Sequence, residues 1–161
     1  MTAPAETQST LDAAAGSISG GAVTLEGGTI NLQGLVSTKA LNYASGQLLN
    51  AANYSGNVDL LGTVTLTPGT LGYGVLQVGT GDAVTLADDG LSNALAISGG
   101  SFDFNGKSAS STVSYVNGAL LNASGLSGDV TLAYVGTKAF TAGSLGAGRV
   151  IVPSGATLDF G

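Results

Sequence analysis

The amino-acid sequence predicts an all-β, single-domain parallel β-solenoid, and three observations support this fold class. First, the chain repeats itself, because residues 27–61 align with residues 99–133 without a gap at an offset of 72. Second, short segments of alternating apolar and polar residues return about every 18 residues, a spacing typical of stacked coils. Third, Gly-rich turns separate these segments, and Gly readily adopts the positive backbone angles of sharp corners.

The long repeat extends almost to the last residue. A two-residue insertion near Ala133 and Tyr134 shifts the offset to 74, after which "TPGTLGYGVLQVGTGDAVTL" aligns with "TAGSLGAGRVIVPSGATLDF" as far as Phe160. Each long repeat divides into units of roughly 16 to 20 residues, which predicts about eight rungs in all. The usual hand of parallel crossover connections favours a right-handed coil.

The repeats also set the expected domain organisation. A chain of 161 residues has the size of one domain and can bury a core. We expect the solenoid over residues 16–161, with one long repeat over about 16–87 and the other over about 88–161. Residues 1–15 are expected to form a flexible N-terminal arm or cap, in which "STLDAAAG" is compatible with one helical turn.

Two series of strands are expected in each coil, joined by a tight turn. The first series comprises "AVTL", "LNYA", "NVDLLG", "VLQV", "ALAI", "VSYV", "DVTL" and "RVIV". The second series comprises "TINL", "QLLN", "TVTL", "AVTL", "SFDF", "ALLN", "KAFT" and "TLDF". A period of two over four residues indicates a half-buried strand, with residues such as Val23 and Leu25 on the same side.

The first series distinguishes a solenoid from a β-sandwich, because stacked coils require similar residues to lie above one another. The predicted ladder consists of Val23, Leu41, Val58, Leu76, Leu95, Val113, Val130 and Val150. The arc that closes each coil usually carries one apolar residue among small polar ones. These arc residues are Leu35, Tyr54, Leu71, Leu91, Leu126 and Leu145. Three inward positions in each coil predict a three-sided cross-section.

Composition excludes several classes of function. The chain has no Cys and no His, which excludes disulfides and thiolate metal sites and removes the commonest general base. Its net charge is −6, and its four cations, Lys39, Lys107, Lys138 and Arg149, are scattered, so we expect no nucleic-acid partner. No apolar run is long enough to span a bilayer, and we expect no membrane insertion. Scarce charge with abundant Gly, Ser, Thr and Asn is typical of extracellular or cell-surface β proteins.

The units "ISGGSFDFNG", "AVTLEGGTINLQG" and "VIVPSGATLDFG" recur about every 19 residues, and such units cover residues 22–161. In this respect the chain resembles the β-helical passengers of bacterial autotransporters and the filamentous-haemagglutinin type of secreted adhesin. The resemblance implies an elongated extracellular rod that serves as a stalk or adhesive surface. It supplies no catalytic motif and no cofactor. Neither a signal peptide before the repeats nor a membrane barrel after them is recognisable in the sequence, in contrast to that family.

Acidic residues are the only candidates for catalysis, since a glycosidase needs two carboxyl groups about 5 to 10 Å apart. The nearest approach to a cluster consists of Asp82, Asp88, Asp89 and Asp103. The long repeat places Asn31 opposite Asp103 and Ala156 opposite Asp82, which favours solvated surface carboxylates over a repeated site. We therefore expect no enzymatic activity.

Two other groups of residues are candidate sites. "ADDGLSN" contains oxygen ligands for calcium in Asp88, Asp89, Ser92 and Asn93, but it lacks the alternating spacing of a calcium loop, so we expect no metal. Asn50 and Asn122 occupy the same place in the long repeat. We expect them to be turn residues that satisfy local backbone groups, with a stacked amide feature as the alternative.

The tyrosines allow two interpretations. Tyr54, Tyr73 and Tyr134 lie in or near arcs, where they could form a surface that stacks on carbohydrate, although such residues more often cover the ends of a core. Tyr43 and Tyr115 are at matching inward positions and are expected in the core.

Solenoid ends expose strand edges that recruit other strands. We therefore predict an assembly interface made of Val23, Leu25, Leu158 and Phe160, with head-to-tail stacking on other copies of the chain. The predicted function is an extracellular structural or adhesive solenoid that polymerises into a surface filament or forms part of a longer adhesin stalk. Its further partners would be glycans or a host surface. The alternatives are a trimeric viral tail or head fibre and a glycan-active enzyme fragment.

Overall fold

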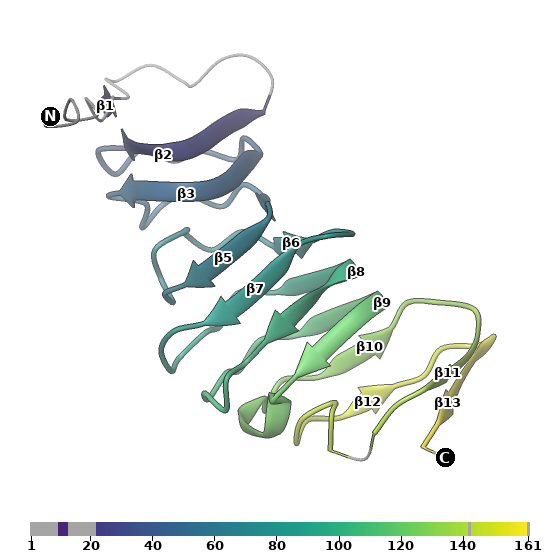
Figure 1. Ribbon diagram of the computed structural model, residues 1–161. Coiled ribbons are helices and arrows are strands. Elements are labelled where there is room, and N and C mark those ends of the chain that lie inside the picture. Colours follow the sequence, from purple (N-terminus) through teal and green to yellow (C-terminus); the bar gives the residue numbers. More distant parts are fainter. Residues whose placement is uncertain (1–9, 13–21, 142, 161) are drawn as a thin grey trace, which may run out of the picture.

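Stacked coils of parallel strands make up the computed structural model, which describes residues 10–12, 22–141 and 143–160. Figure 1 shows the coils stacked in chain order, from the purple N-terminal end to the yellow C-terminal end. Every strand pair is parallel, and the solenoid has about 8 turns. The predicted fold class is therefore confirmed.

The strands of the first long repeat follow the expected segments. They are β2 (Val23–Asn31), β3 (Leu41–Leu49), β4 (Val58–Leu60), β5 (Thr63–Leu66), β6 (Leu76–Val78) and β7 (Ala83–Leu86), and they are preceded by β1 (Thr10–Asp12). The second repeat contains β8 (Leu95–Asp103), β9 (Val113–Leu121), the short 3-10 helix η1 (Ala123–Gly125), β10 (Val130–Leu132), β11 (Gly136–Ala139), β12 (Val150–Ile151) and β13 (Ala156–Asp159). The order of long and split strands is the same in the two repeats.

The first two rungs of each repeat differ from expectation at the corner between the two series. There β2, β3, β8 and β9 run through the corner as single nine-residue strands, where two short strands and a tight turn were predicted. The β2–β3 and β8–β9 pairs show register shifts at this point, so each corner is a bulged bend. Gly46 permits the close stacking of β3 on β2, since its φ is 109° and a Cβ there would lie 2.4 Å from the Gly28 carbonyl oxygen.

The predicted first-series ladder is confirmed along its whole length. Backbone pairing places Val23 opposite Leu41, and the remaining members follow in the expected order to Val150. From Val58 to Val130 these side chains are at most 2% exposed, because each has a similar apolar residue above and below it.

The second series is continuous only in part. β5, β7, β8 and β9 pair in sequence, but among the described strands β5 has no pairing with β3 and β11 has none with β9. Within the last pair, Lys138 lies opposite Leu158, one residue away from the register implied by stacking "KAFT" on "TLDF". The predicted strand segment "KAFT" starts one residue too late. At an offset of 74, the counterpart of "TVTL" (residues 63–66) is residues 137–140, and Thr137 is the residue that pairs with Thr157.

The core fills the inside of the coil from both series and from the arcs. Five of the six predicted arc residues are at most 4% exposed, whereas Leu35 is only half-buried. In that first arc Ser37 forms the bridge to Tyr54, so a polar residue occupies the expected apolar position. Ala109 is a buried arc residue that the sequence did not reveal, because a single methyl group does not stand out among small residues.

Strand β1 is the one described element within the predicted N-terminal arm. Thr10–Asp12 pairs in parallel with Thr29–Asn31 of β2, so these three residues form a strand and not part of a helical turn. The remainder of the predicted arm lies outside the described residues, and its boundary at residue 15 stays a prediction.

Candidate functional site

A break in the second-series ladder recurs once in each repeat. Leu61 N donates to Tyr43 O at 2.9 Å, and Ala133 N donates to Tyr115 O at 2.7 Å, which marks equivalent points in the two copies. Beyond these bonds β3 separates from β5, and β9 separates from β11. The two breaks therefore create equivalent positions for a surface site.

In the first repeat this break forms a hollow of about 320 Å³, hereafter the β3–β5 hollow. Its lining consists of Tyr43, Gly46, Gln47, Leu48, Leu49, Thr65, Thr67, Thr70 and Leu71. The Tyr43 hydroxyl donates to Gly46 O at 3.1 Å, and burial raises its pKa above the ordinary value for tyrosine. The Thr70 hydroxyl donates to Thr67 O at 2.7 Å. An aromatic ring, an amide and hydroxyl groups thus line the same hollow.

In the second repeat the equivalent position is occupied by side chains. Tyr115, the counterpart of Tyr43, lies 5.3 Å from Phe140 and 6.4 Å from Tyr134 between ring centroids. The Lys138 ammonium lies 4.9 Å from the Tyr134 ring centroid and donates to Val116 O at 2.6 Å. Tyr134 belongs to the two-residue insertion that the repeat alignment revealed. The insertion therefore accounts for one of the rings that occupy this second position.

The chemistry of the β3–β5 hollow suits noncovalent binding of a polar, uncharged ligand. Its lining contains no carboxylate or cation, and a tyrosine phenol is neutral at physiological pH. Hydroxyl and amide groups next to a tyrosine ring are what sugars require for hydrogen bonding and stacking. The sequence could not reveal this hollow, because Tyr43 was expected in the core and the break is created by pairing.

A second hollow, of about 310 Å³, lies on the adjoining corner. Its lining includes the carboxylates of Asp59 and Asp82. Asp82 accepts from Gly62 N at 2.7 Å with one oxygen and from Gly79 N at 3.1 Å with the other, and it thereby joins two rungs. These bonds engage both oxygens of Asp82 in contacts with the backbone of the coil.

The other predicted acidic candidates lie at different places. Asp82 precedes β7, whereas Asp88 and Asp89 follow it, and four strand residues at about 3.3 Å each separate them. Asp103 lies one rung further on, where Oδ1 accepts from Asn105 N at 2.7 Å and from Asn122 Nδ2 at 2.8 Å. Strand β7 thus lies between Asp82 and the adjacent Asp88 and Asp89, and Asp103 lies on the following rung.

The side chains of the suggested calcium segment have partners in different rungs. Asp89 Oδ1 accepts from Ser108 N at 2.7 Å in the next rung, and this bond lowers the pKa of the Asp89 carboxyl. Asn93 Nδ2 instead donates to Gly72 O and Gly74 O, both at 3.0 Å, in the preceding rung. Within the described part of the chain, no group of three or more acidic side chains is arranged to hold a metal ion. Asp89 and Asn93 thus contact different rungs, and the expectation that Asp88, Asp89 and Asn93 hold no metal stays a prediction.

The two matching asparagines are turn residues with stacked partners. Asn50 and Asn122 adopt left-handed backbone angles, with φ of 53° and 49°, as a turn requires. Their amides reach the preceding rung, where Asn50 Nδ2 donates to Asn31 Oδ1 at 2.7 Å and Asn122 Nδ2 to Asp103 Oδ1. The expectation of local backbone partners was wrong, because the side-chain oxygen one rung below lies within reach.

The tyrosines suggested as a carbohydrate surface do not share one environment. Tyr54 is 4% exposed, whereas Tyr73 is 72% exposed. The Tyr54 hydroxyl donates to Lys39 O at 2.5 Å, and burial together with the charge of Asp59 raises its pKa to about 12. Tyr54 is thus a core residue, as the simpler interpretation required.

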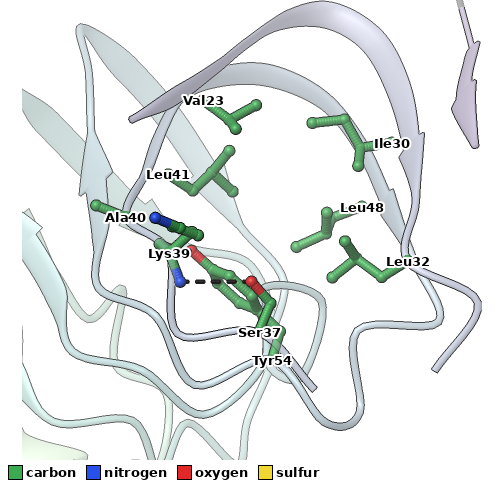
Figure 2. Close-up of a pocket in the computed structure, with 9 residues that line it drawn as sticks. All are labelled: Val23, Ile30, Leu32, Ser37, Lys39, Ala40, Leu41, Leu48 and Tyr54. Atoms are coloured by element: carbon green, nitrogen blue, oxygen red, sulfur yellow. Dashed lines mark hydrogen bonds between the residues drawn. The ribbon is translucent and has the colours of Figure 1, made fainter. Parts of the chain in front are cut away.

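The predicted assembly residues lie at the two ends of the coil. Val23 and Leu158 are half-buried, Leu25 is 4% exposed and Phe160 is 54% exposed. Figure 2 shows Val23 and Ile30 facing the interior of the first coil, with Leu41 and Leu48 on the next rung. These apolar side chains line a narrow hollow inside the first coil.

Comparisons of the chain with protein-family models, curated proteins and solved structures give no match. No helix in the described part of the chain is long and apolar enough to cross a membrane.

Proposed function

We propose that this chain is a non-enzymatic extracellular β-solenoid that serves as a structural or adhesive rod. Its type would be that of autotransporter passengers and filamentous-haemagglutinin adhesins. The observation that carries the proposal is the first-series ladder, which continues from Val23 to Val150 through every rung. Such a ladder gives a stiff, regular spacer whose length is set by the number of coils.

The contacts of the acidic residues support a structural role. Asp82, Asp89 and Asp129 each accept a hydrogen bond from the backbone of a neighbouring rung. Asp129 also forms an ion pair with Arg149 of the next rung at 2.6 Å, which lowers the pKa of the carboxyl. Carboxylates that join coils in this way stabilise the stacking.

The β3–β5 hollow supports the adhesive part of the proposal, with neutral glycans as the ligand class. Gln47 of β3 and Thr65 of β5 offer polar groups from the two strands that border the break, and the half-buried Tyr43 of β3 also lines the hollow. Their counterparts at offsets of 72 and 74 are Ala119 and Ala139, so the second repeat lacks these polar groups.

An affinity measurement tests the adhesive part. A glycan array would first identify a neutral oligosaccharide that the protein binds. Calorimetry would then compare the affinity of the protein for this oligosaccharide with the affinities of the Gln47→Ala and Thr65→Ala variants. Loss of one hydrogen bond should weaken binding about fivefold. Thr85→Ala is the matched control, because Thr85 is exposed and lies opposite Thr65 on the next rung. Equal binding by all variants would contradict the hollow as the site, and glycan turnover that is lost in Asp82→Asn would contradict the non-enzymatic role.

The rod would also continue between copies by head-to-tail stacking. Two core positions of the last rung are exposed, whereas their counterparts in the first repeat are buried. Val152 is 44% exposed and its counterpart Val78 is 0% exposed, while Phe160 is 54% exposed and Leu86 is 0% exposed. A further coil on this end would bury both side chains and gain the associated hydrophobic free energy.

Light scattering over a concentration series, with negative-stain electron microscopy of the same samples, tests this stacking. Filaments with an axial repeat of about 40 Å are expected for stacked copies. Particles that remain monomeric at every concentration would contradict stacking and leave the rod as an isolated spacer. Compact trimers would instead favour the viral-fibre alternative.

A further inference from the structure

The junction between the two long repeats shows how one copy would stack on another. At this junction β7 pairs with β8, with Val84 opposite Phe102 and Thr85 opposite Asp103. The offset of 74 relates β7 to β13, and the offset of 72 relates β8 to β2. The same junction between copies would therefore place Leu158 of one copy opposite Ile30 of the other.

Strand β1 already occupies this position within the chain. Its pairing is parallel, with Thr10 opposite Thr29, Leu11 opposite Ile30 and Asp12 opposite Asn31. Its sequence, Thr-Leu-Asp, is identical to residues 157–159 in β13. Thus β1 has the sequence, direction and register that the repeat junction assigns to β13 of a second copy.

We propose that β1 is an internal competitor for head-to-tail stacking, which it limits by occupying the edge of β2 that would receive β13 of another copy. This inference rests on the stacking part of the proposed function. The partner is a second copy of the same chain, and the surface consists of β2 on one copy with β12 and β13 on the other.

The competition is unequal in two respects. β1 covers only Thr29–Asn31, and among the described strands none pairs with Val23–Leu25 on the side opposite β3. A second copy would add β12 to that first-series edge, since the β6–β8 register predicts Val150 opposite Val23. β1 has instead the advantage of being attached, which gives it an effective concentration on the order of millimolar. Stacking should therefore begin only at high protein concentration.

Cysteine pairs can test both arrangements, because the chain contains no native Cys. Thr10→Cys with Thr29→Cys should form a disulfide within the chain and hold β1 in place, since paired strands bring Cα atoms within disulfide range. Thr29→Cys with Thr157→Cys should form disulfides only between copies, since about seven rung spacings of about 4.8 Å separate the two positions.

The expected results distinguish the competitor role from stacking itself. The oxidised Thr10→Cys and Thr29→Cys protein should remain monomeric where the reduced protein associates, and a reductant should restore association. The oxidised Thr29→Cys and Thr157→Cys protein should give a ladder of covalent oligomers. Leu11→Pro should lower the concentration at which association begins at least tenfold, because Pro disfavours strand pairing, with Leu11→Val as the control.

Each contrary result has a definite meaning. Covalent oligomers from the Thr29→Cys and Thr157→Cys protein, together with association of the locked protein, would support stacking but overturn β1 as a competitor. Monomers under all conditions, including Leu11→Pro, would overturn stacking and this inference with it. If Leu11→Pro associates but added Phe160→Lys does not prevent association, β13 is not the partner strand.

Discussion

Gly74 occupies a position in the coil at which a single added methyl group should separate two rungs. It lies at the corner before β6, and its backbone is not in the left-handed region. A Cβ at this position would lie 1.8 Å from Gly56 O and 2.6 Å from Gly56 C. Both atoms belong to the backbone of the preceding rung, so rotation of a side chain cannot relieve the overlap. Gly74→Ala therefore tests how strictly the spacing of the coils is fixed.

The free-energy cost follows from the bonds next to the clash. Relief of the overlap requires the two rungs to move apart by more than about 1 Å, since nonbonded carbon and oxygen atoms do not approach within about 3 Å. Tyr73 N donates to Tyr54 O at 2.8 Å, and Val58 N donates to Val75 O at 2.9 Å, beside this contact. Loss of two buried backbone bonds and of the adjoining apolar contacts should reduce the free energy of unfolding by about 3 to 5 kcal/mol.

Urea denaturation followed by far-ultraviolet circular dichroism measures this change. Gly62→Ala is the matched control, because nothing lies within 4 Å of its added Cβ although its φ is 70°. Its cost should be limited to backbone strain of about 1 to 2 kcal/mol. A loss in Gly74→Ala no larger than that in Gly62→Ala would refute the reasoning, since it would show that neighbouring coils separate freely.

Three further changes test local contacts. The raised pKa of Tyr54 means that its neutral phenol adds to the free energy of unfolding below the ordinary pKa of 10.0, and that this stabilisation is lost as pH rises to about 12. Tyr54→Phe should therefore remove the loss of stability above pH 10. Urea denaturation at several pH values measures this difference. Asn122→Ala should cost about 1 kcal/mol through strain at its φ of 49°, whereas Asn122→Gly should cost less, as thermal melts would show. Lys138→Met should lower the free energy of unfolding by about 1 kcal/mol, because the ammonium contacts to Val116 O and the Tyr134 ring are lost. Urea denaturation measures this change. A larger loss in Lys138→Ala than in Lys138→Met would indicate that the aliphatic part of the Lys138 side chain also stabilises the fold by packing.

The first-series ladder could be predicted because two independent patterns agree on it. Alternation identifies the inward side of each strand, and the repeat fixes which residues lie above one another. Residues such as Val58 and Val130 satisfy both conditions, and both are 0% exposed. Where a register depended on the alternation of a single segment, as around Lys138, the prediction was wrong by one residue.

The candidate site could not be predicted, because it depends on contacts between rungs. The alternation of apolar and polar residues in "QLLN" and "TVTL" does not indicate that β3 and β5 are unpaired, because both strands form as expected. The amides of Asn50 and Asn122 likewise find partners 19 residues earlier in the chain. Local residue preferences describe the turn at each position but not the side chain that lies beneath it.

The two strand series have different structural roles in this fold. The first series pairs through every rung, so its residues between the two end rungs have neighbours on both sides and vary little in size. The second series contains the β3–β5 hollow and the edge that β1 covers, and both depend on an interrupted or exchangeable pairing. The first-series ladder connects neighbouring coils where second-series pairing is absent among the described strands, between β3 and β5 and between β9 and β11. Ligand binding is therefore expected on the second-series side of the solenoid, whereas head-to-tail assembly would join both series.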